Sequence, residues 1–168
     1  IGTETIDLIC TDPPYNMDKA EWDSIPDYGK WVEDWLRQCW RVLKPSGSIY
    51  IFQRQNSAIA QTIIALESLG FHSLANPPLY RDCVQGTGAG PWGGNYETIL
   101  FYSKTDEPYV NTDVLEVERE EKDKRAYRGQ TYEKNKIGGY LRFPALDEKD
   151  PERVDFPTQK PVALMELL

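Results

Sequence analysis

The sequence predicts an α/β fold built on a mostly parallel sheet with an antiparallel pair of strands at one edge. Apolar runs at residues 6–11 and 48–52 flank a helical pattern over about residues 28–43, which is the arrangement of a right-handed βαβ unit. The run at residues 48–52 is almost continuously apolar, as in parallel strands that are covered on both faces. Two further strand-like segments, residues 71–80 and 97–102, are joined by a Gly-rich connection, so we expect them to pair antiparallel.

The first predicted strand, residues 6–11 (Ile-Asp-Leu-Ile-Cys-Thr), is expected to be buried. A polar stretch over residues 16–27 follows it. A helix is then predicted from about Tyr28 to Leu43, because its apolar residues recur at spacings of three and four and form one broad face. These apolar residues are Trp31, Trp35, Leu36, Cys39, Trp40, Val42 and Leu43. The segment Lys-Pro-Ser-Gly at residues 44–47 is expected to end the helix.

The second strand, residues 48–52, leads into a second predicted helix over about residues 56–69, which ends at Gly70. Residues 71–80 are weakly strand-like and contain a Pro-Pro pair, so they are expected at an edge of the sheet, where missing backbone donors are tolerated. Residues 97–102 (Glu-Thr-Ile-Leu-Phe-Tyr) form a clear strand.

The chain is predicted to have three parts. Residues 1–103 hold the strands and helices above, and residues 156–168 begin an apolar helix. Residues 104–155 are charged and poorly periodic, and they form either a small appended element or a partly disordered insertion. From Lys122 to Arg142 the local charge is +5, although the whole chain carries −8. Such a basic segment is compatible with a nucleic-acid footprint and equally with a solvated loop.

The composition is that of a globular domain with a real core, since 168 residues include 40% apolar and 27% charged side chains. No apolar run approaches the ~20 residues that span a bilayer, so no membrane association is expected. Three widely spaced cysteines match neither a metal site nor a disulfide framework, which indicates a reducing cytoplasm and no metal. The glycine-rich run at residues 86–90 resembles a nucleotide-binding loop, but no helix can start in the Pro-Trp-Gly-Gly that follows, so we expect a flexible hairpin connection.

Four residues at the end of the first predicted strand form a candidate site: Asp12, Pro13, Pro14 and Tyr15. Open α/β sheets bind ligands outside the carboxyl ends of their strands. The two prolines leave carbonyl acceptors on a stiff loop, between the carboxylate of Asp12 and the aromatic face of Tyr15. These groups suit a planar ligand that bears an NH2. The same tetrapeptide is also typical of an ordinary turn whose Tyr covers the core.

Two separate motifs resemble those of the amino-methylating DNA methyltransferases, which modify adenine N6 or cytosine N4. Residues 11–16 (Thr-Asp-Pro-Pro-Tyr-Asn) are similar to the catalytic motif of this family, and residues 156–161 (Phe-Pro-Thr-Gln-Lys-Pro) to its His-Pro-Thr-Gln-Lys-Pro element. The Glu-Trp-Asp at residues 21–23, the Trp-rich helix and the segment at residues 42–48 are also similar in kind and spacing. The order of the motifs is that of the β class, in which the target-recognition region lies between them.

The resemblance covers residues 1 to about 103 and 155 to 168, and it implies an AdoMet-dependent methyltransferase (Rossmann-like) fold. It implies a site-specific enzyme that transfers a methyl group from AdoMet to adenine N6 of a flipped base in double-stranded DNA. Asp at the head of the motif favours adenine, because the cytosine-N4 relatives tend to have Ser there. The setting implied is the cytoplasm of a bacterial, archaeal or phage-infected cell. A homodimer and a companion restriction endonuclease are compatible with it as partners.

The resemblance also implies roles for the tetrapeptide. The Asp12 carboxylate and the Pro13 carbonyl would accept the two N–H bonds of the amine, which localises its lone pair toward the methyl donor. Pro14 completes the motif, and Tyr15 would stack on the flipped base.

Cofactor contacts are implied for Thr158, Gln159 and Lys160. The alternative for this segment is a plain helix start, with Thr158 as N-cap and Pro161 in the first turn. For DNA phosphates the candidates are Lys122, Lys124, Arg125, Arg128, Lys134 and Lys136.

The chain departs from the family pattern at several positions. Phe156 replaces a His, Arg81 replaces a commoner Lys, and Asn-Tyr-Glu at residues 95–97 stands where a His-Glu pair is commoner. The Phe-x-Gly-x-Gly cofactor motif is not in the sequence, so we expect this chain to be a portion of a longer enzyme and to be inactive by itself. The alternatives are a cytosine-N4 DNA methyltransferase, a protein-glutamine or RNA methyltransferase, and a non-catalytic DNA-binding fragment.

Overall fold

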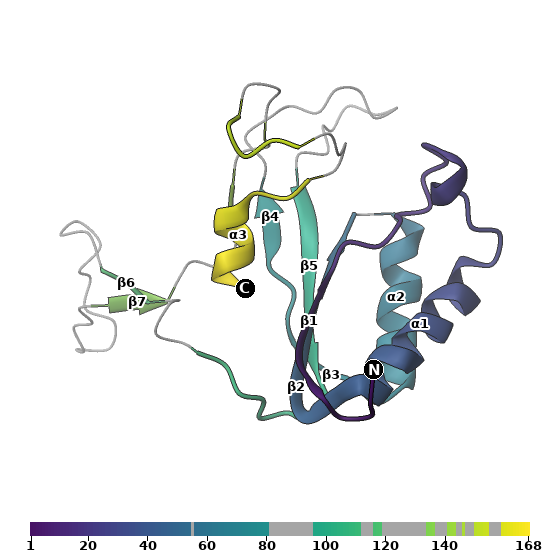
Figure 1. Ribbon diagram of the computed structural model, residues 1–168, viewed down its shortest axis with the longest axis horizontal. Helices are drawn as coiled ribbons and strands as arrows, with labels where there is room; N and C mark the ends of the chain where they lie inside the picture. Colours follow the sequence, from purple (N-terminus) through teal and green to yellow (C-terminus); the bar gives the residue numbers. More distant parts are fainter. Residues whose placement is uncertain are drawn as a thin grey trace, which may run out of the picture.

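The computed structural model describes residues 1–54, 56–80, 96–111, 116–118, 134–136, 141–143, 146, 150–154 and 159–168. Helices α1 (Tyr28–Val42) and α2 (Ser57–Ser68) cover one face of a central sheet, and the short helix α3 (Val162–Leu167) lies on the other face (Figure 1). The strands of this sheet are β1 (Ile6–Thr11), β2 (Leu43–Gln53), β3 (His72–Ala75), β4 (Pro78–Tyr80), β5 (Tyr96–Ser103) and β8 (Leu141–Arg142). The remaining described elements are the 3-10 turn η1 (Glu21–Asp23) and a two-stranded sheet of β6 (Glu116–Glu118) and β7 (Lys134–Lys136).

The described strands of the central sheet run in the order β1-β2-β5-β4-β8, with β3 also paired to β5. The pairs β1·β2 and β4·β8 are parallel, whereas β2, β3 and β4 are each antiparallel to β5. All of these strands except β5 therefore run in one direction. This confirms the predicted α/β fold with a mostly parallel sheet and antiparallel pairing.

The prediction that residues 71–80 form an edge is wrong for β4. Leu79 pairs with Leu141 of β8 on one side and with Glu97 of β5 on the other. A proline is tolerated in this interior strand because Pro78 is the first residue of β4, where the ladder needs no backbone donor. The range predicted as an insertion thus contributes a strand to the central sheet.

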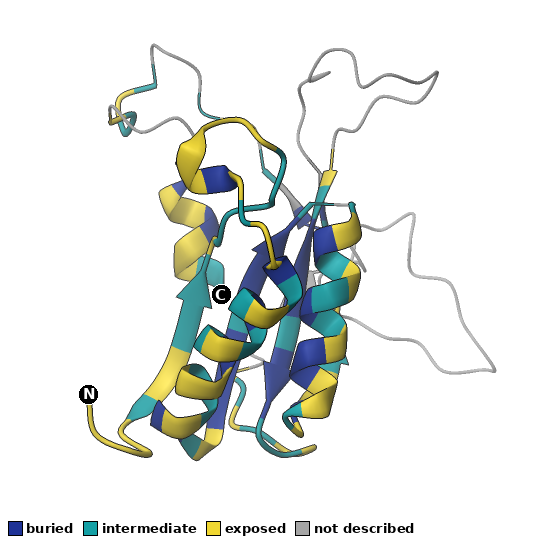
Figure 2. Ribbon diagram, turned by 90° about the vertical axis from the view of Figure 1, so that its right-hand side faces the viewer, coloured by how far each residue is buried: buried dark blue, intermediate teal, exposed yellow. Residues whose placement is uncertain are grey.

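β1 is a strand, as predicted, but the expectation that it is buried is wrong. None of its six residues is buried, and Leu8 is 45% exposed. The reason is its position at the end of the described sheet, where only β2 pairs with it. Figure 2 shows β1 as half-buried and exposed beside the buried strands of the interior.

The connection between α1 and β2 also differs from the prediction. The helix ends at Val42 and β2 starts at once at Leu43, so residues 44–47 belong to the strand. The register jumps from Ile6↔Leu43 to Leu8↔Ser48, which marks an irregularity where these residues are accommodated. Glycine suits position 47, because a Cβ there would lie 3.1 Å from the backbone oxygen of Asp7, which is tighter than most Cβ contacts.

The second helix agrees with its prediction. α2 has Asn56 as N-cap and Leu69 as C-cap, and Gly70 follows with a φ of 91°, a conformation that glycine adopts readily. No helix in the described parts of the chain is long and apolar enough to cross a bilayer.

Two apolar clusters hold the layers together. Side chains of α1 and α2, among them Val32, Leu36 and Leu66, pack on one face of the sheet. On the other face Leu164 of α3 packs among buried residues that lie in the four strands β2, β4, β5 and β8, namely Phe52, Leu79, Ile99 and Leu141. The second cluster places the segment before α3 against the ends of the strands.

Candidate active site at the carboxyl ends of β1 and β2

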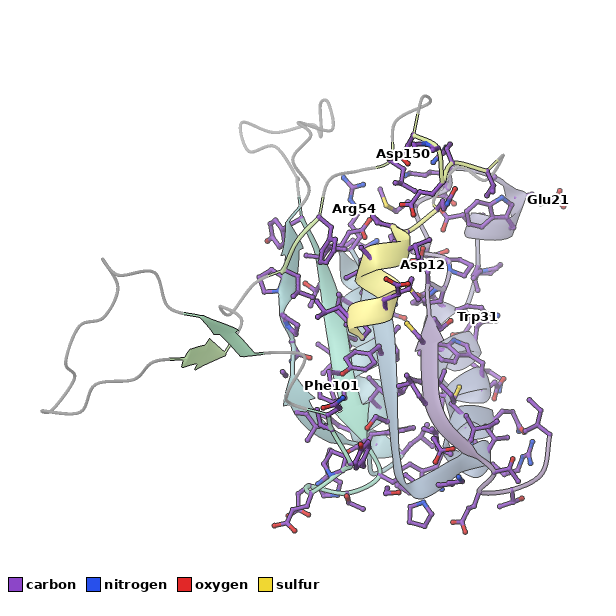
Figure 3. All side chains as sticks on the ribbon, turned by 60° about the vertical axis from the view of Figure 1, so that its left-hand side comes forward. Asp12, Glu21, Trp31, Arg54, Phe101 and Asp150 are labelled. Atoms are coloured by element: carbon purple, nitrogen blue, oxygen red, sulfur yellow. The ribbon has the colours of Figure 1, made fainter. Side chains whose placement is uncertain are left out.

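The predicted catalytic residues lie where three segments of the chain converge. β1 and β2 are parallel neighbours, with Thr11 paired to Ile51, so their carboxyl ends share one edge of the sheet. β5 runs the other way, and its first residues reach the same edge. The residues before α3 also reach this edge, so that Lys160 contacts Asp12. Figure 3 shows Asp12 beside α3, at the same end of the sheet as Arg54.

A cluster of four polar side chains forms at this edge. The ammonium of Lys160 lies 2.6 Å from Asp12 Oδ2 and 3.4 Å from Glu97 Oε2. The hydroxyl of Tyr15 donates to Asp12 Oδ1 at 2.5 Å. The side chain of Lys160 is only 8% exposed, whereas that of Asp12 is 24% exposed. The carboxylate of Asp12 is therefore held at both oxygens and still faces solvent.

The backbone of the tetrapeptide is held from both helices. Tyr28, at the start of α1, donates its hydroxyl to the Pro14 carbonyl at 2.8 Å. Asn56, the N-cap of α2, donates its amide to the Tyr15 carbonyl at 2.7 Å. Among the described residues no donor contacts the Pro13 carbonyl. The Pro13 carbonyl, which is predicted to bind an amino group, is therefore left available by these contacts.

A buried network of hydrogen bonds holds the Tyr28 hydroxyl. The Gln53 amide donates to the Tyr28 hydroxyl at 3.3 Å and to the Thr62 hydroxyl at 3.1 Å, and Thr62 donates to the Ala58 carbonyl. Burial raises the pKa of Tyr28, so its phenol remains a donor at neutral pH. The site is therefore braced through side chains that are almost inaccessible to solvent.

The loop after the tetrapeptide is organised around Asp23. This carboxylate is 2% exposed and accepts the backbone N–H groups of Asn16, Met17 and Lys19. The Asn16 side chain accepts in turn from the backbone N–H of Ile25. These bonds hold Asn16 at a positive φ of 53°, an unusual conformation that Asn tolerates.

Cys10, on β1 two residues before Asp12, stays a neutral thiol. Its burial and the nearby carboxylate of Asp12 raise the pKa of this thiol. In the described parts of the chain, no three His, Cys, Asp or Glu side chains gather where they could hold a metal ion.

In the segment predicted to contact a cofactor, residues 158–160, Gln159 has a structural role. The Gln159 amide donates to the Glu152 carbonyl at 2.7 Å and accepts from the Val154 N–H at 2.8 Å. α3 begins at Val162, whose N–H is accepted by the Glu152 carboxylate, and Pro161 is the N-cap. The alternative of a plain helix start places Pro161 in the first turn, and it is wrong on this point because the helix begins one residue later, with Pro161 as its N-cap.

Several predicted residues lie outside the described part of the chain. These are Thr158, Lys122, Lys124, Arg125, Arg128 and the glycine-rich run at residues 86–90. Lys134 and Lys136 lie on β7, which is paired with β6, and the structure describes their backbone alone. DNA contact by these residues, and cofactor contact by residues 158–160, remain predictions.

Four residues of this site are not identifiable from the motifs. Tyr28 and Gln53 look like ordinary core positions in the sequence, and Asn56 looks like a plain helix cap. Glu97 stands in a strand pattern and carries a signal only as part of the family resemblance.

Comparison with known proteins places this site in context. The sequence model of a DNA methylase family matches residues 6–168. The DNA adenine methyltransferase YhdJ of Escherichia coli (strain K12) is 32% identical over 98% of this chain and 60% of its own length. The Type II methyltransferase M.HpaI of Haemophilus parainfluenzae is 31% identical over 96% of this chain and 52% of its own. The Type II methyltransferase M.BglII of Bacillus subtilis is 34% identical over 77% of this chain and 38% of its own.

Solved structures share the fold. A complex named M1.HpyAVI-SAM superposes with a TM-score of 0.54 at 20% identity, covering 99% of this chain and 65% of that chain. A cytosine-N4-specific PvuII DNA methyltransferase superposes with a TM-score of 0.51 at 17% identity, covering 68% of this chain and 48% of its own. The chain spans 38% to 60% of the length of the curated relatives named above.

Proposed function

Because this chain belongs to the family of DNA methyltransferases that modify adenine N6 or cytosine N4, we propose that the full-length protein transfers a methyl group from AdoMet to adenine N6 in double-stranded DNA. The observation that carries the proposal is a pair of acceptors at the end of β1. The Asp12 carboxylate is fixed by Tyr15 and Lys160, and the Pro13 carbonyl is uncommitted among the described residues because its neighbours are held by Tyr28 and Asn56.

Two acceptors are what an exocyclic amine requires. Its nitrogen lone pair is delocalised into the base, which makes the amine a poor nucleophile. Acceptance of one N–H by Asp12 and the other by Pro13 localises that lone pair out of the ring plane. Because both acceptors sit on a rigid loop, little reorganisation is needed when the base arrives.

The site fits a positively charged methyl donor. The carboxylates of Asp12 and Glu97 lie together at this edge, where both contact the Lys160 ammonium, and carboxylate oxygens attract a neighbouring cation. AdoMet, when bound, supplies a methyl group on a cationic sulfonium. We propose that residues 158–160 lie at the edge of the cofactor site, where Lys160 would link the cofactor segment to the catalytic carboxylate.

The base must leave the duplex to reach a site of this kind. We propose that Tyr15 stacks on the flipped base, since its ring is held by the hydroxyl bond to Asp12 and by its carbonyl bond to Asn56. The lysines and arginines of residues 122–136 are proposed to contact phosphates. Cytoplasmic location, a homodimer and a companion restriction endonuclease are further proposals from the resemblance.

The test is a methylation assay on the full-length protein with labelled AdoMet, followed by mass spectrometry of the DNA nucleosides. We expect N6-methyladenine. Substitution of Asp12 by Asn removes the anionic acceptor, and we expect it to lower kcat by at least about 100-fold while DNA binding changes little. Asp34→Asn is the matched control, because Asp34 is exposed on α1 and pairs with Lys30 on the surface.

The possible results separate the alternatives. N4-methylcytosine as the sole product would replace adenine by cytosine as the target, and label found only in RNA or protein would contradict the proposal. If the wild-type protein binds DNA and AdoMet but transfers no methyl group, the alternative of a non-catalytic DNA-binding protein holds.

A further inference from the structure

We propose that the guanidinium of Arg54 binds a backbone phosphate of the target strand next to the flipped nucleotide. The inference rests on the proposed function, and it assigns a ligand to an arginine that has no part in the proposed chemistry. Arg54 directly follows β2, whose carboxyl end shares one edge of the sheet with that of β1. Figure 3 shows Arg54 and Asp12 at this same end of the sheet.

The backbone of Arg54 is fixed on both sides. The side chain before it, Gln53, is completely buried and donates to two hydroxyl groups of the buried network. The Arg54 carbonyl accepts the backbone N–H of Asn56 at 2.9 Å, and the Asn56 side chain donates to the Tyr15 carbonyl at 2.7 Å. Arg54 is thereby tied through Asn56 to the loop that is proposed to hold the base. A phosphate bound to its guanidinium would keep a defined position relative to that loop.

The alternation of side chains along β2 assigns Arg54 to the face of the sheet that holds Lys160. Gln53 points to the helical face, where it bonds to a residue of α2, whereas Phe52 packs with α3 on the opposite face. The Lys160 ammonium lies 5.1 Å from the centre of the Phe52 ring. Because successive side chains of a strand point to opposite faces, Arg54 belongs to the face of Phe52 and Lys160.

The guanidinium of Arg54 has donors available for an anion. It makes no hydrogen bond or ion pair within the described part of the chain, whereas the Lys160 ammonium contacts Asp12 and Glu97. Arg54 is half-buried, so its donors are partly shielded from water. An arginine presents its N–H groups in a planar fork that matches two oxygens of a phosphate or a carboxylate.

The DNA substrate supplies the anion. A base that enters the site brings its own sugar and phosphates to the edge of the sheet, because they are covalently attached to it. The whole chain carries −8, so a phosphate at this edge needs a local cation to hold it. Phosphate contacts fix the position of the nucleic acid without reading its sequence, which suits a residue beside the reacting base. The carboxylate of AdoMet is a second source of the same chemistry, and the experiment below separates the two.

DNA with single neutralised phosphates tests the inference in the full-length protein. Methylphosphonates are placed one at a time on either side of the base that the wild-type protein methylates, and the Kd for DNA is measured with S-adenosylhomocysteine present. We expect one of these replacements to weaken wild-type binding about tenfold, because a charge-assisted contact is lost. Arg54→Gln should weaken binding of unmodified DNA by a similar factor, and the same methylphosphonate should then cause no further loss. The slope of log K against log salt should become shallower by about 1 in this variant.

Two further variants are matched to Arg54→Gln. Arg54→Lys keeps the charge without the planar fork, so its Kd should lie between those of the wild type and Arg54→Gln. Arg37→Gln is the control for loss of one positive charge, because Arg37 is exposed on α1 and pairs with Glu33. We expect this control to leave the Kd and the salt dependence unchanged.

The outcomes distinguish the inference from the function on which it depends. A wild-type protein that tolerates every methylphosphonate overturns the inference without use of a variant. Equal losses from the methylphosphonate in the wild type and in Arg54→Gln also overturn it, while wild-type methylation still supports the proposed function. Weaker binding of AdoMet by Arg54→Gln in the absence of DNA would assign the guanidinium to the cofactor carboxylate instead. A wild-type protein that transfers no methyl group to DNA overturns the proposed function, and the role of Arg54 falls with it.

Discussion

Tyr28 shows how a single buried side chain can hold the loop at residues 12–15 in place. It is 3% exposed, donates to the Pro14 carbonyl and accepts from Gln53. It therefore links the loop after β1 to the buried polar network between β2 and α2. Each bond is modest, but both partners are shielded from water, and an unpaired buried partner is costly.

Replacement of Tyr28 by Phe removes both bonds while keeping the ring. We expect the free energy of unfolding to fall by about 1–3 kcal/mol, because the Pro14 carbonyl and the Gln53 amide each lose a partner. We expect kcat for DNA methylation to fall about tenfold, since the acceptors beside Pro14 become less well placed. Urea denaturation and initial rates measure the two effects.

The control for this substitution is Tyr109→Phe. Tyr109 is 81% exposed, so removal of its hydroxyl should change neither stability nor rate. Wild-type activity in Tyr28→Phe would show that the loop is held adequately without this bond.

Helix α2 contributes to the site through its first turn. Asn56 accepts the Ala58 N–H with one end of its side chain, which caps the helix, and donates to the Tyr15 carbonyl with the other end. The start of α2 is thereby anchored to the loop at residues 12–15.

Asn56→Asp and Asn56→Ala separate these two roles. Asp keeps the capping oxygen, so we expect stability within about 1 kcal/mol of the wild type, but it places an oxygen against the Tyr15 carbonyl and should lower kcat about tenfold. Ala removes both contacts and should cost about 1 kcal/mol in addition to the loss of rate. Thermal unfolding and methylation rates measured together test this, and an Asp variant with a full rate would refute the link between cap and loop.

At the scale of the whole molecule, α3 connects stability to the geometry of the site. Leu164 is fully buried against β2, β4, β5 and β8, and Lys160 lies shortly before it in the segment that leads into α3. A change in the core under α3 should therefore reach the Asp12 carboxylate.

Leu164→Ala should lower the free energy of unfolding by about 2–5 kcal/mol, the usual range for a large-to-small change in a core. It should also lower kcat at temperatures well below the transition, because the ammonium loses its fixed position. Met165→Ala, on the exposed side of α3, is the control and should stay within about 0.5 kcal/mol of the wild type. Equal effects of the two substitutions would contradict this assignment of the α3 faces.

Local patterns in the sequence determine most of the elements and mark the tetrapeptide at residues 12–15 as a candidate site. Helical spacing predicts α1 and α2 within one or two residues at each end, and Gly70 predicts the end of α2, because capping and periodicity are short-range properties. The position of Asp12 at the end of a strand is predictable for the same reason.

Only the tertiary structure decides which strands lie side by side and which side chains meet. The apolar sequence of β1 does not say that the strand lies at the end of the described sheet, and β8 is too short to be recognised before it pairs with β4. The contact between Asp12 and Lys160 joins residues 148 positions apart. Sequence spacing carries no signal for such a contact, because packing of α3 and the direction of β5 bring the ammonium and both carboxylates to one edge.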